Sequence, residues 1–456
     1  MTVSRFCHAG WIGLALMLFS LPAWAKTPGT IPVEYYKLAN GLKVVLSPDK
    51  HAPIVTVAVY YNIGFRIEPK DRTGFAHLFE HMMFQGSKNF KKGEFDKLTE
   101  RNGGFNNGST RFDFTNYFEV MPTHMLEPTL WAEADRMKGL DLNQASLTNQ
   151  QGVVKNEVKV NVINRPYGGF PWLDMPQYAN ENWYNAHNFY GDLKDLDAAR
   201  LEDVESFFKT YYAPNNAALV IVGDFDLSTA KKWIEKYFNA IPAVQMPQRP
   251  DLAEPAQLKE KRITKTDSLI NKPAIAIAYK MPEKNTPEYY AMGLINQLLV
   301  EGKDSRLYQR MVQQKGFTSN VNGGINYLGN MFNYNGPMLW MTDLIYDNAV
   351  SPDSIIAELD AAIADIDRDA SAASIDLALI KMRSDLYDNL GGDYGIGLAD
   401  MLATLALFED NPARVNELEQ AFKMVTPELL RKTIGTYLRP HNRTILIAVP
   451  VKTSAK

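Results

Sequence analysis

Three polar residues interrupt the apolar segment Phe75–Phe84, and their types and spacing suit a metal ion. His77 and His81 lie four residues apart, with Glu80 beside the second histidine. A helix turns by about 100° per residue, so both imidazoles and the carboxylate would share one side. Histidines one helical turn apart can bind the same zinc ion. A catalytic zinc keeps a position for water, so a third protein ligand is still needed.

A purely structural role is the alternative for these residues. Two histidines in an apolar helix could be hydrogen-bonded core groups. Glu80 favours the metal interpretation, because burying an acid in an apolar segment is costly unless it has a partner or a function.

Composition and charge restrict the class of protein. The chain has 456 residues, 46% hydrophobic and 22% charged, which indicates a globular protein of more than one domain. Its formal net charge of −4 gives no basic patch for nucleic acid or for an anionic membrane.

The first 25 residues have the features of a secretory signal peptide. Arg5 precedes the apolar run Trp11–Phe19, and Ala23-Trp24-Ala25 is a small-residue cleavage signal. We expect cleavage after Ala25 and export to the bacterial periplasm, with an uncleaved anchor as the alternative. Cys7 is the single cysteine, so the mature chain would have no disulfide. No later apolar run reaches the roughly 18 residues that a membrane span needs.

The elements around the triplet alternate between strands and helices. In the first half we expect strands at Val33–Lys37, Leu42–Leu46, Ile54–Ile63, Arg111–Val120 and Ala217–Gly223. We expect helices at Phe95–Arg101, Thr123–Met137, Ala145–Ile163, Arg200–Tyr212 and Leu227–Tyr237. Asn106–Thr110 is interpreted as a turn-rich loop, and Pro166–Leu196 as irregular.

The same order of elements recurs after the proline-rich stretch Pro242–Pro255, which indicates an internal repeat. The strand Ala274–Lys280 corresponds to the Ile54 strand, and the helix Tyr289–Val300 to the histidine helix. Further helices are expected at Ile355–Ile366 and Ile375–Leu390.

An offset of 216 residues places Gly293, Asn296 and Gln297 where the first copy has its triplet, so only the first copy can bind the metal. We therefore expect a signal peptide (1–25), an N-terminal zinc-binding domain (26–245), a linker (246–256) and a homologous C-terminal domain without metal ligands (257–456).

A glutamate on the helix Ala145–Ile163 gives the triplet a family context. His77-x-x-Glu80-His81 is the inverted zinc peptidase motif, and Glu157 follows His81 by 76 residues. With these residues the chain resembles the pitrilysin/insulinase family of zinc metallopeptidases (inverzincins), in its processing-peptidase-like branch. The resemblance spans roughly residues 30 to 450 and includes Gly103-Gly104-x-Asn106-x-x-x-Thr110, Tyr211-x-Ala213-Pro214-Asn215-Asn216, Val222-Gly223-Asp224 and Ser305-Arg306-Leu307.

The resemblance implies a zinc metalloendopeptidase that hydrolyses peptides or unfolded segments. His77, His81 and Glu157 would bind one Zn²⁺ per chain, and Glu80 would be the general base. The alternative for Glu157 is a solvated helix face.

The family fold is α+β, with two homologous domains that together form half of a clam-like chamber. Each domain is a mostly antiparallel sheet with helices packed on one face. Asn106 and Asn107 would contact a substrate added to a sheet edge, or would be ordinary turn residues.

Two departures from the family pattern stand out. Members often carry an acid seven residues before the glutamate ligand, where this chain has Gln150; its amide could hydrogen-bond the ligand shell without adding charge. Self-sufficient members also carry an Arg and a Tyr that hold the substrate carbonyl, and the matching positions here are Val312 and Ser319. Arg310 and Phe317 have the right spacing in the wrong register.

We therefore expect a homologous partner subunit, in a heterodimer, to supply the Arg/Tyr pair. Two other interpretations remain open. One is a non-catalytic assembly or binding subunit of the same fold, and the other is a secreted metal-binding protein without hydrolytic activity.

Overall fold

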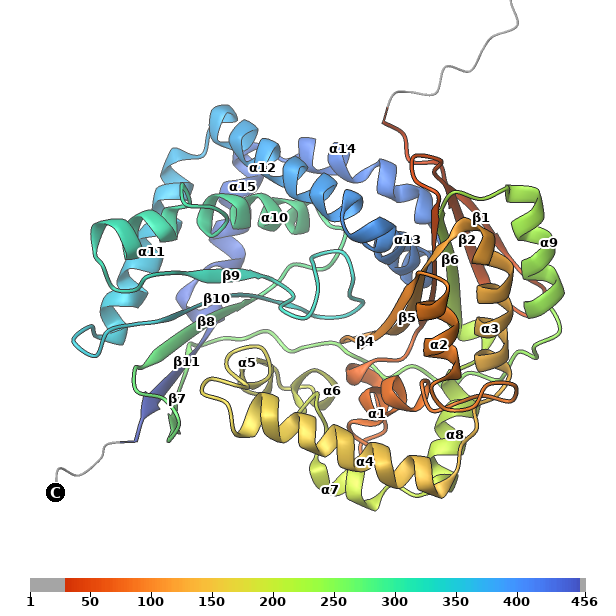
Figure 1. Cartoon of the computed structure of the whole chain (residues 1–456). Coiled ribbons are helices and arrows are strands. Elements are labelled where there is room, and N and C mark those ends of the chain that lie inside the picture. Colours follow the sequence, from red (N-terminus) through yellow and green to blue (C-terminus); the bar gives the residue numbers. More distant parts are fainter. Residues whose placement is uncertain (1–28, 452–456) are drawn as a thin grey trace, which may run out of the picture. The chain divides into compact units, whose positions relative to one another are not determined.

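Six strands from the N-terminal half form one sheet, in the order β1-β2-β6-β3-β5-β4 (Figure 1). The structure is a computed structural model that describes residues 29–451, so the expected signal peptide lies outside the described residues. Neighbouring strands are antiparallel except β2 and β6, which run parallel. The strands are β1 Glu34–Lys37, β2 Lys43–Pro48, β3 Ile54–Tyr61, β4 Phe105–Thr110, β5 Thr115–Pro122 and β6 Ala217–Gly223.

A second sheet of five strands repeats this arrangement in the order β7-β11-β8-β10-β9. Its one parallel pair is β7 with β11, which corresponds to β2 with β6. The strands are β7 Lys261–Asp267, β8 Ala274–Lys280, β9 Asn322–Ile325, β10 Leu339–Ile345 and β11 Arg443–Pro450. The matching order and directions confirm the internal repeat that the sequence predicts, with β1 as an addition to the first sheet.

Helices connect the strands in both halves. Those of the first half are α1 Phe75–Met82, α2 Glu94–Arg101, α3 Leu126–Lys138, α4 Gln144–Val158, α5 Asp174–Ala179, α6 Trp183–Ala186, α7 Leu193–Ala198, α8 Leu201–Tyr211 and α9 Leu227–Phe238. Those of the second half are α10 Pro287–Leu299, α11 Pro352–Asp369, α12 Ala372–Gly391, α13 Ile396–Glu409, α14 Leu418–Lys423 and α15 Pro427–Tyr437. Among the described residues, no helix is long and apolar enough to cross a membrane.

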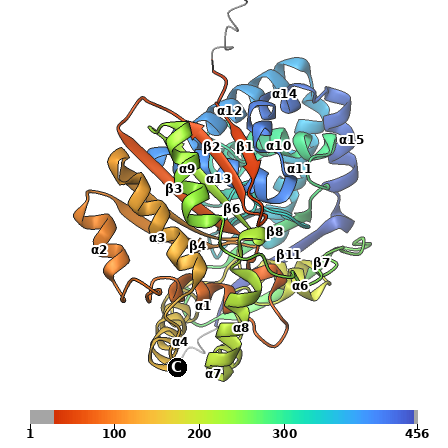
Figure 2. The same ribbon diagram turned by 90° about the vertical axis from the view of Figure 1, so that its right-hand side faces the viewer.

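The core of the first half lies between its sheet and the layer formed by α1, α3, α8 and α9. Val55, Val57 and Val59 of β3 point into this core, because alternate strand residues face the same side. Leu78 and Phe79 of α1 meet them there. Figure 2 shows α3 and α9 over this face of the sheet. The burial of these side chains fixes the position of α1, which carries the predicted triplet.

Each sheet also receives a helix from the other half of the chain on its opposite face. Helix α13 packs on β2, β3 and β6 of the first sheet. Thr56 and Tyr60 of β3 point to that face, where their hydroxyls donate to Tyr394 O and Asp400 Oδ1 at 2.8 and 3.0 Å. In return α5 packs on β7, β8 and β11, where Met175 joins the core of the second half. The halves therefore complete each other.

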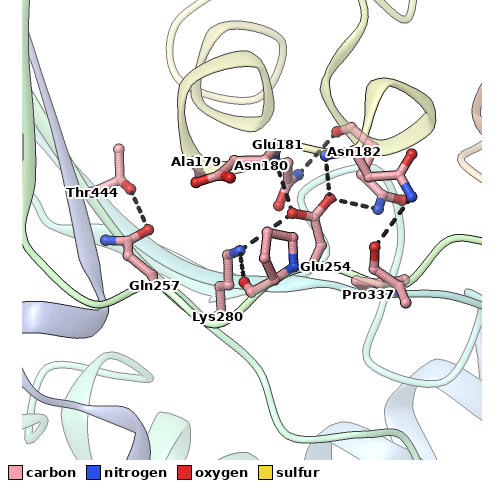
Figure 3. Close-up of polar contacts among 12 residues, drawn as sticks. Ala179, Asn180, Glu181, Asn182, Glu254, Gln257, Lys280, Pro337 and Thr444 are labelled. Carbon is pink, nitrogen blue, oxygen red and sulfur yellow. Dashed lines mark hydrogen bonds and ion pairs between the residues drawn. The ribbon is translucent and has the colours of Figure 1, made fainter.

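The segment between the two sheets has no regular structure over residues 242–258, as its prolines predict. Glu254 attaches it to both halves (Figure 3). Its buried carboxylate accepts hydrogen bonds from the backbone N–H groups of Glu181 and Asn182 at 3.0 and 3.2 Å, and pairs with Lys280 Nζ of β8 at 3.2 Å.

Two expectations about the first half are wrong. Asn106–Thr110 is part of strand β4, because β5 supplies backbone partners along its whole length. The stretch Pro166–Leu196 contains the short helices α5, α6 and most of α7. In α6 and α7 the side chains of Asn182 and Asp192 cap the first turn, and such single-turn helices have too little apolar periodicity to detect.

Candidate metal centre

Helix α1 presents the triplet because its other side is buried. Phe75, Leu78, Phe79 and Met82 lie in the core, so His77, Glu80 and His81 point away from it. His77 is buried, whereas Glu80 and His81 are half-buried. The helix begins after Gly74, whose φ of 81° is in the left-handed region that favours glycine.

The first turn of α1 is capped by a buried carboxylate from the preceding segment. Glu68 accepts hydrogen bonds from the N–H groups of Gly74 and Ala76, at 2.9 and 2.5 Å. These N–H groups would otherwise lack partners at the start of the helix. A negative charge at this end also interacts favourably with the helix dipole. Burial raises the pKa of Glu68, and His187 Nε2 lies 3.9 Å from its Oε2.

Helix α4 supplies the third residue of the candidate centre. It starts where Asn143 Oδ1 accepts a hydrogen bond from Ser146 N–H, and it packs along α1. Leu147 and Val154 fix one side of α4 in the core, and this turns Glu157 toward the two histidines.

The three side chains meet with the spacing of metal ligands. His77 Nε2 and His81 Nε2 are 3.3 Å apart, and the Glu157 oxygens lie 3.5 and 3.2 Å from them. Tetrahedral zinc with Zn–N bonds of about 2.0–2.1 Å separates two ligand nitrogens by about 3.3–3.4 Å. Among the described residues this is the one group of histidine, cysteine or acidic side chains close enough to hold a metal ion. The donor set therefore fits zinc.

Charge within the group is compatible with this role. Hydrogen bonds with His77 and then His81 hold the pKa of the Glu157 carboxyl well below its usual range. Glu157 is consequently an anion at neutral pH, which is the form that binds a cation.

Glu80 is held in place beside the ligands by the edge strand. Thr110 Oγ1 of β4 donates a hydrogen bond to Glu80 Oε2 at 2.7 Å. The other carboxylate oxygen has no such protein partner among the described residues, so it can accept a proton from a water molecule at the centre.

Tyr190 is a neighbour of the centre that the sequence interpretation missed. Its hydroxyl lies 3.5 Å from Glu157 Oε1, and its ring packs edge-on against His77 at 5.1 Å. Burial, and then the Glu157 charge, raise the pKa of Tyr190 to about 12, so the hydroxyl keeps its proton. The only signal in the sequence is the aromatic-rich stretch that follows the helix of Glu157.

The three remaining predicted site residues lie nearby but apart from the ligands. Gln150 is buried two turns before Glu157 on the same side of α4, and no hydrogen bond among the described residues joins it to a ligand. Asn106 and Asn107 are consecutive on β4 and therefore face opposite sides. Asn106 donates to Asp96 and Thr99 of α2, whereas Asn107 is exposed.

In the second half, α10 corresponds to α1, and it carries a glycine and two amides where α1 carries its histidines and glutamate. Gly293, Asn296 and Gln297 of α10 line a cavity of about 420 Å³ together with Asp385 of α12. Gln297 Nε2 donates to Asp385 Oδ2 at 2.7 Å. As the repeat predicts, this copy has no histidine at the position of the triplet.

The Arg/Tyr pair is also missing, as the sequence indicates. Arg310 pairs with Glu358 and Asp365 of α11 at 2.8 and 2.5 Å, and these contacts raise its pKa. Its guanidinium is therefore already paired with carboxylates of the second half. Val312 is half-buried and Ser319 exposed, and neither side chain can replace the Arg or the Tyr.

Family models match most of both halves. Residues 43–167 match the model described as insulinase (peptidase family M16), which includes all three candidate ligands. Residues 198–382 match the model described as the peptidase M16 inactive domain. The second match begins just before α8, so it includes the end of the first half as well as part of the second.

Individual proteins show the same relationship. The zinc protease PqqE of Helicobacter pylori is 30% identical over 315 residues, which are 68% of this chain and 70% of that protein. A crystal structure of a protease from H. pylori has a TM-score of 0.83 and 25% identity, covering 92% of this chain and 100% of that one. The periplasmic protease PqqL of Escherichia coli has a TM-score of 0.72 and 19% identity; the match covers 92% of this chain but 48% of PqqL. This chain thus belongs to peptidase family M16, the pitrilysin/insulinase family.

Proposed function

We propose that the chain is a zinc-dependent endopeptidase that hydrolyses peptides or unfolded segments. The observation that carries this proposal is the 3.3 Å separation of the His77 and His81 Nε2 atoms, with the Glu157 carboxylate within 3.5 Å of both. One Zn²⁺ held by these three side chains would supply Lewis acidity to the attacking water and to the peptide carbonyl.

Glu80 would carry out the proton transfers. Its carboxylate accepts a proton from the attacking water and then gives it to the amine of the leaving peptide. Thr110 holds one oxygen of Glu80 during both steps, which leaves the other oxygen to move the proton. His77, His81 and Glu157 keep the ligand geometry constant.

The substrate would bind as an extended strand along β4. This strand ends the order of the first sheet, so one of its edges has no strand partner among the described residues. A peptide added there would make main-chain hydrogen bonds that depend little on sequence. Thr110 lies at the Glu80 end of β4, which would bring the scissile bond to the centre. Asn107 is a candidate contact for the substrate. The side chain of Asn106 could contact a substrate only after its hydrogen bonds to Asp96 and Thr99 of α2 are broken.

We also propose that a homologous subunit supplies the Arg/Tyr pair in a heterodimer. Val312 and Ser319 replace the Arg/Tyr pair among the described residues, and Arg310 is paired within the second half. Donors of this kind to the developing oxyanion are worth roughly 3 kcal/mol each in other hydrolases. The fold also occurs as about half of the longer PqqL chain, which supports pairing with a second copy of the fold.

The remaining expectations belong to the same proposal. The chain would be exported to the periplasm, and its leader would be residues 1–25. The domains would be residues 26–245 and 257–456, joined by residues 246–256. Strands β1–β6 lie before this linker and β7–β11 after it, which supports the boundary.

A fluorogenic peptide assay with zinc quantification tests the proposal. We expect hydrolysis by the chain together with its partner subunit, and loss of hydrolysis in Glu80→Gln with zinc still bound. Normal hydrolysis by zinc-loaded Glu80→Gln would overturn the mechanism. Full turnover by the isolated wild-type chain would overturn the heterodimer but not the peptidase.

A non-catalytic assembly or binding subunit is the second candidate, favoured by the missing Arg/Tyr pair. Metal analysis separates the two, because a subunit of that kind needs no zinc. Stoichiometric zinc without hydrolysis, even beside the partner, would instead indicate a metal-binding protein.

A further inference from the structure

Tyr190 contacts two of the three candidate ligands at once. Its hydroxyl can donate to Glu157 Oε1 at 3.5 Å. Its ring meets the His77 ring at 5.1 Å between centroids, with an angle of 68° between the planes. A single side chain therefore restrains one ligand from α1 and another from α4.

His77 depends on ring contacts for its orientation. Histidine ligands usually donate their second nitrogen to a carboxylate or carbonyl, which fixes the ring. The Nδ1 atom of His77 is buried and has no hydrogen-bond partner among the described residues. The ring instead contacts the rings of His81, Tyr190 and Phe65, at 5.0, 5.1 and 6.5 Å between centroids.

The backbone of Tyr190 is fixed to the start of α1. A Cβ on Gly191 would lie 2.5 Å from Gly74 Cα, so these two backbone segments can approach this closely only because both residues are glycines. Asp192 N–H donates to Thr73 Oγ1 at 2.8 Å at the same place. This docking holds the backbone of Tyr190 beside the start of α1, the helix that carries His77.

The other side of the Tyr190 ring is also restrained. Trp172 packs against it at 5.4 Å between centroids, with an angle of 71° between the planes. Trp172 itself is fixed, since its Nε1–H donates to Gly168 O at 3.1 Å. The tyrosine thus stands between an indole and an imidazole, with its hydroxyl directed to Glu157.

We propose that Tyr190 is the positioning residue of this metal centre. Its ring sets the orientation of His77, and its hydroxyl binds Glu157 Oε1 so that Oε2 stays 3.2 Å from His81 Nε2. The proposal rests on the zinc site of the proposed function, but it concerns metal affinity and not hydrolysis. Tyr190 is assigned this role through its contacts with Glu157 and His77 alone.

Tyr190→Phe tests the hydroxyl while keeping the ring. We expect its zinc dissociation constant, from competition with a chromophoric chelator, to rise about 10–100-fold. The visible spectrum of the Co²⁺-substituted protein should also change, because it reports ligand geometry. The matched control is Tyr184→Phe, a tyrosine of the same segment whose ring packs on Trp183. This control should bind zinc as the wild type does.

A double-mutant cycle with Glu157→Gln separates the hydrogen bond from general loosening. If Tyr190 acts through Glu157, Tyr190→Phe should change zinc affinity much less in the Glu157→Gln background. Equal zinc affinity in Tyr190→Phe and wild type, or an equal loss in both backgrounds, would overturn the role of the hydroxyl. Tyr190→Leu tests the ring, and we expect it to bind zinc more weakly than Tyr190→Phe at an unchanged circular dichroism spectrum. Equal zinc affinity of these two folded variants would overturn the role of the ring. Failure of the peptidase proposal would appear only in the hydrolysis of Glu80→Gln.

Discussion

Thr110 Oγ1 donates a 2.7 Å hydrogen bond to Glu80 Oε2, which joins the edge strand of the first sheet to the helix of the metal centre. The strand proposed to bind substrate thus also fixes the proposed general base. Binding of a peptide along β4 and the position of the Glu80 carboxylate are therefore mechanically linked.

Removal of this hydroxyl should slow hydrolysis without loss of zinc. For Thr110→Val we expect a kcat roughly tenfold lower, since the Glu80 carboxylate can then rotate. The control is Ser109→Ala, which removes the neighbouring hydroxyl that contacts Asn116 on β5 instead. Steady-state kinetics with zinc quantification checks both variants. Equal kcat values for Thr110→Val and wild type would contradict the assigned role of Thr110.

A buried charge cluster should make stability depend on pH. Glu119 and Glu133 share the guanidinium of Arg136, and all three side chains are almost fully buried. Burial raises the pKa of Glu119 from 4.5 to about 7. Between these values the folded protein keeps a proton that the unfolded chain releases, so this group's contribution to stability falls as pH rises and then levels above about 7.

Glu119→Gln should remove this dependence, because an amide does not titrate. The stability of the variant relative to wild type should rise between pH 5 and pH 7, by at most about 1.4 kcal/mol per pH unit. Urea unfolding at several pH values measures the difference, with the exposed Glu202→Gln as control. Parallel curves for Glu119→Gln and wild type would show that Glu119 is ionised throughout.

Loss of the Glu254 carboxylate should destabilise the whole chain. In Glu254→Ala the backbone N–H groups of Glu181 and Asn182 lose this acceptor, whereas Lys280 keeps Pro255 O and the amide of Asn185 keeps Leu252 O. Because hydrogen bonds to a charged group contribute about 1.5–3 kcal/mol, we expect the free energy of unfolding to fall by about that amount. Glu181→Gln is the matched control, because its side chain forms a partly exposed pair with Lys261. A free energy of unfolding close to that of the control would show that the linker is held by other contacts.

Removal of zinc should lower stability but leave the fold intact. Helices α1 and α4 are anchored by Phe79, Leu78 and Val154 in the core, so the apo protein should keep its circular dichroism spectrum. Zinc at 100 times its dissociation constant would add about 2.7 kcal/mol. Thermal unfolding with and without a chelator measures this difference. The stabilisation by zinc should be smaller in Glu157→Gln than in wild type. The same stabilisation in both proteins would show that the metal binds at another site.

The sequence predicted those parts of the fold whose residue patterns are local. Ile54–Tyr61 is a strand because β-branched residues dominate it, and Gln144–Val158 is a helix with its own cap. The grouping of His77 with His81 was predictable because the two are one turn apart, whereas Glu157 was assigned through the family resemblance. Strand β4 was not, since its Asn, Gly and Ser residues favour turns and only pairing with β5 makes it a strand.

Contacts between segments that are distant in the sequence could not be predicted from local residue patterns. Tyr190 reaches Glu157 only because two glycines bring its turn against α1. Helix α13 is apolar on most of its surface, so no amphipathic face indicates that it packs against the other half. Both contacts depend on packing that a single segment does not encode.

The reciprocal placement of α5 and α13 also determines where this chain could be recombined with a relative. A chimera joined at residues 246–256 would place a foreign α13 on the native first sheet and a native α5 on the foreign second sheet. The contact of α13 includes the part-buried pair of Tyr60 with Asp400, and the contact of α5 includes the ion pair of Asp174 with Lys265. A functional hybrid would therefore have to exchange the receiving strands of each sheet together with the helix that covers them.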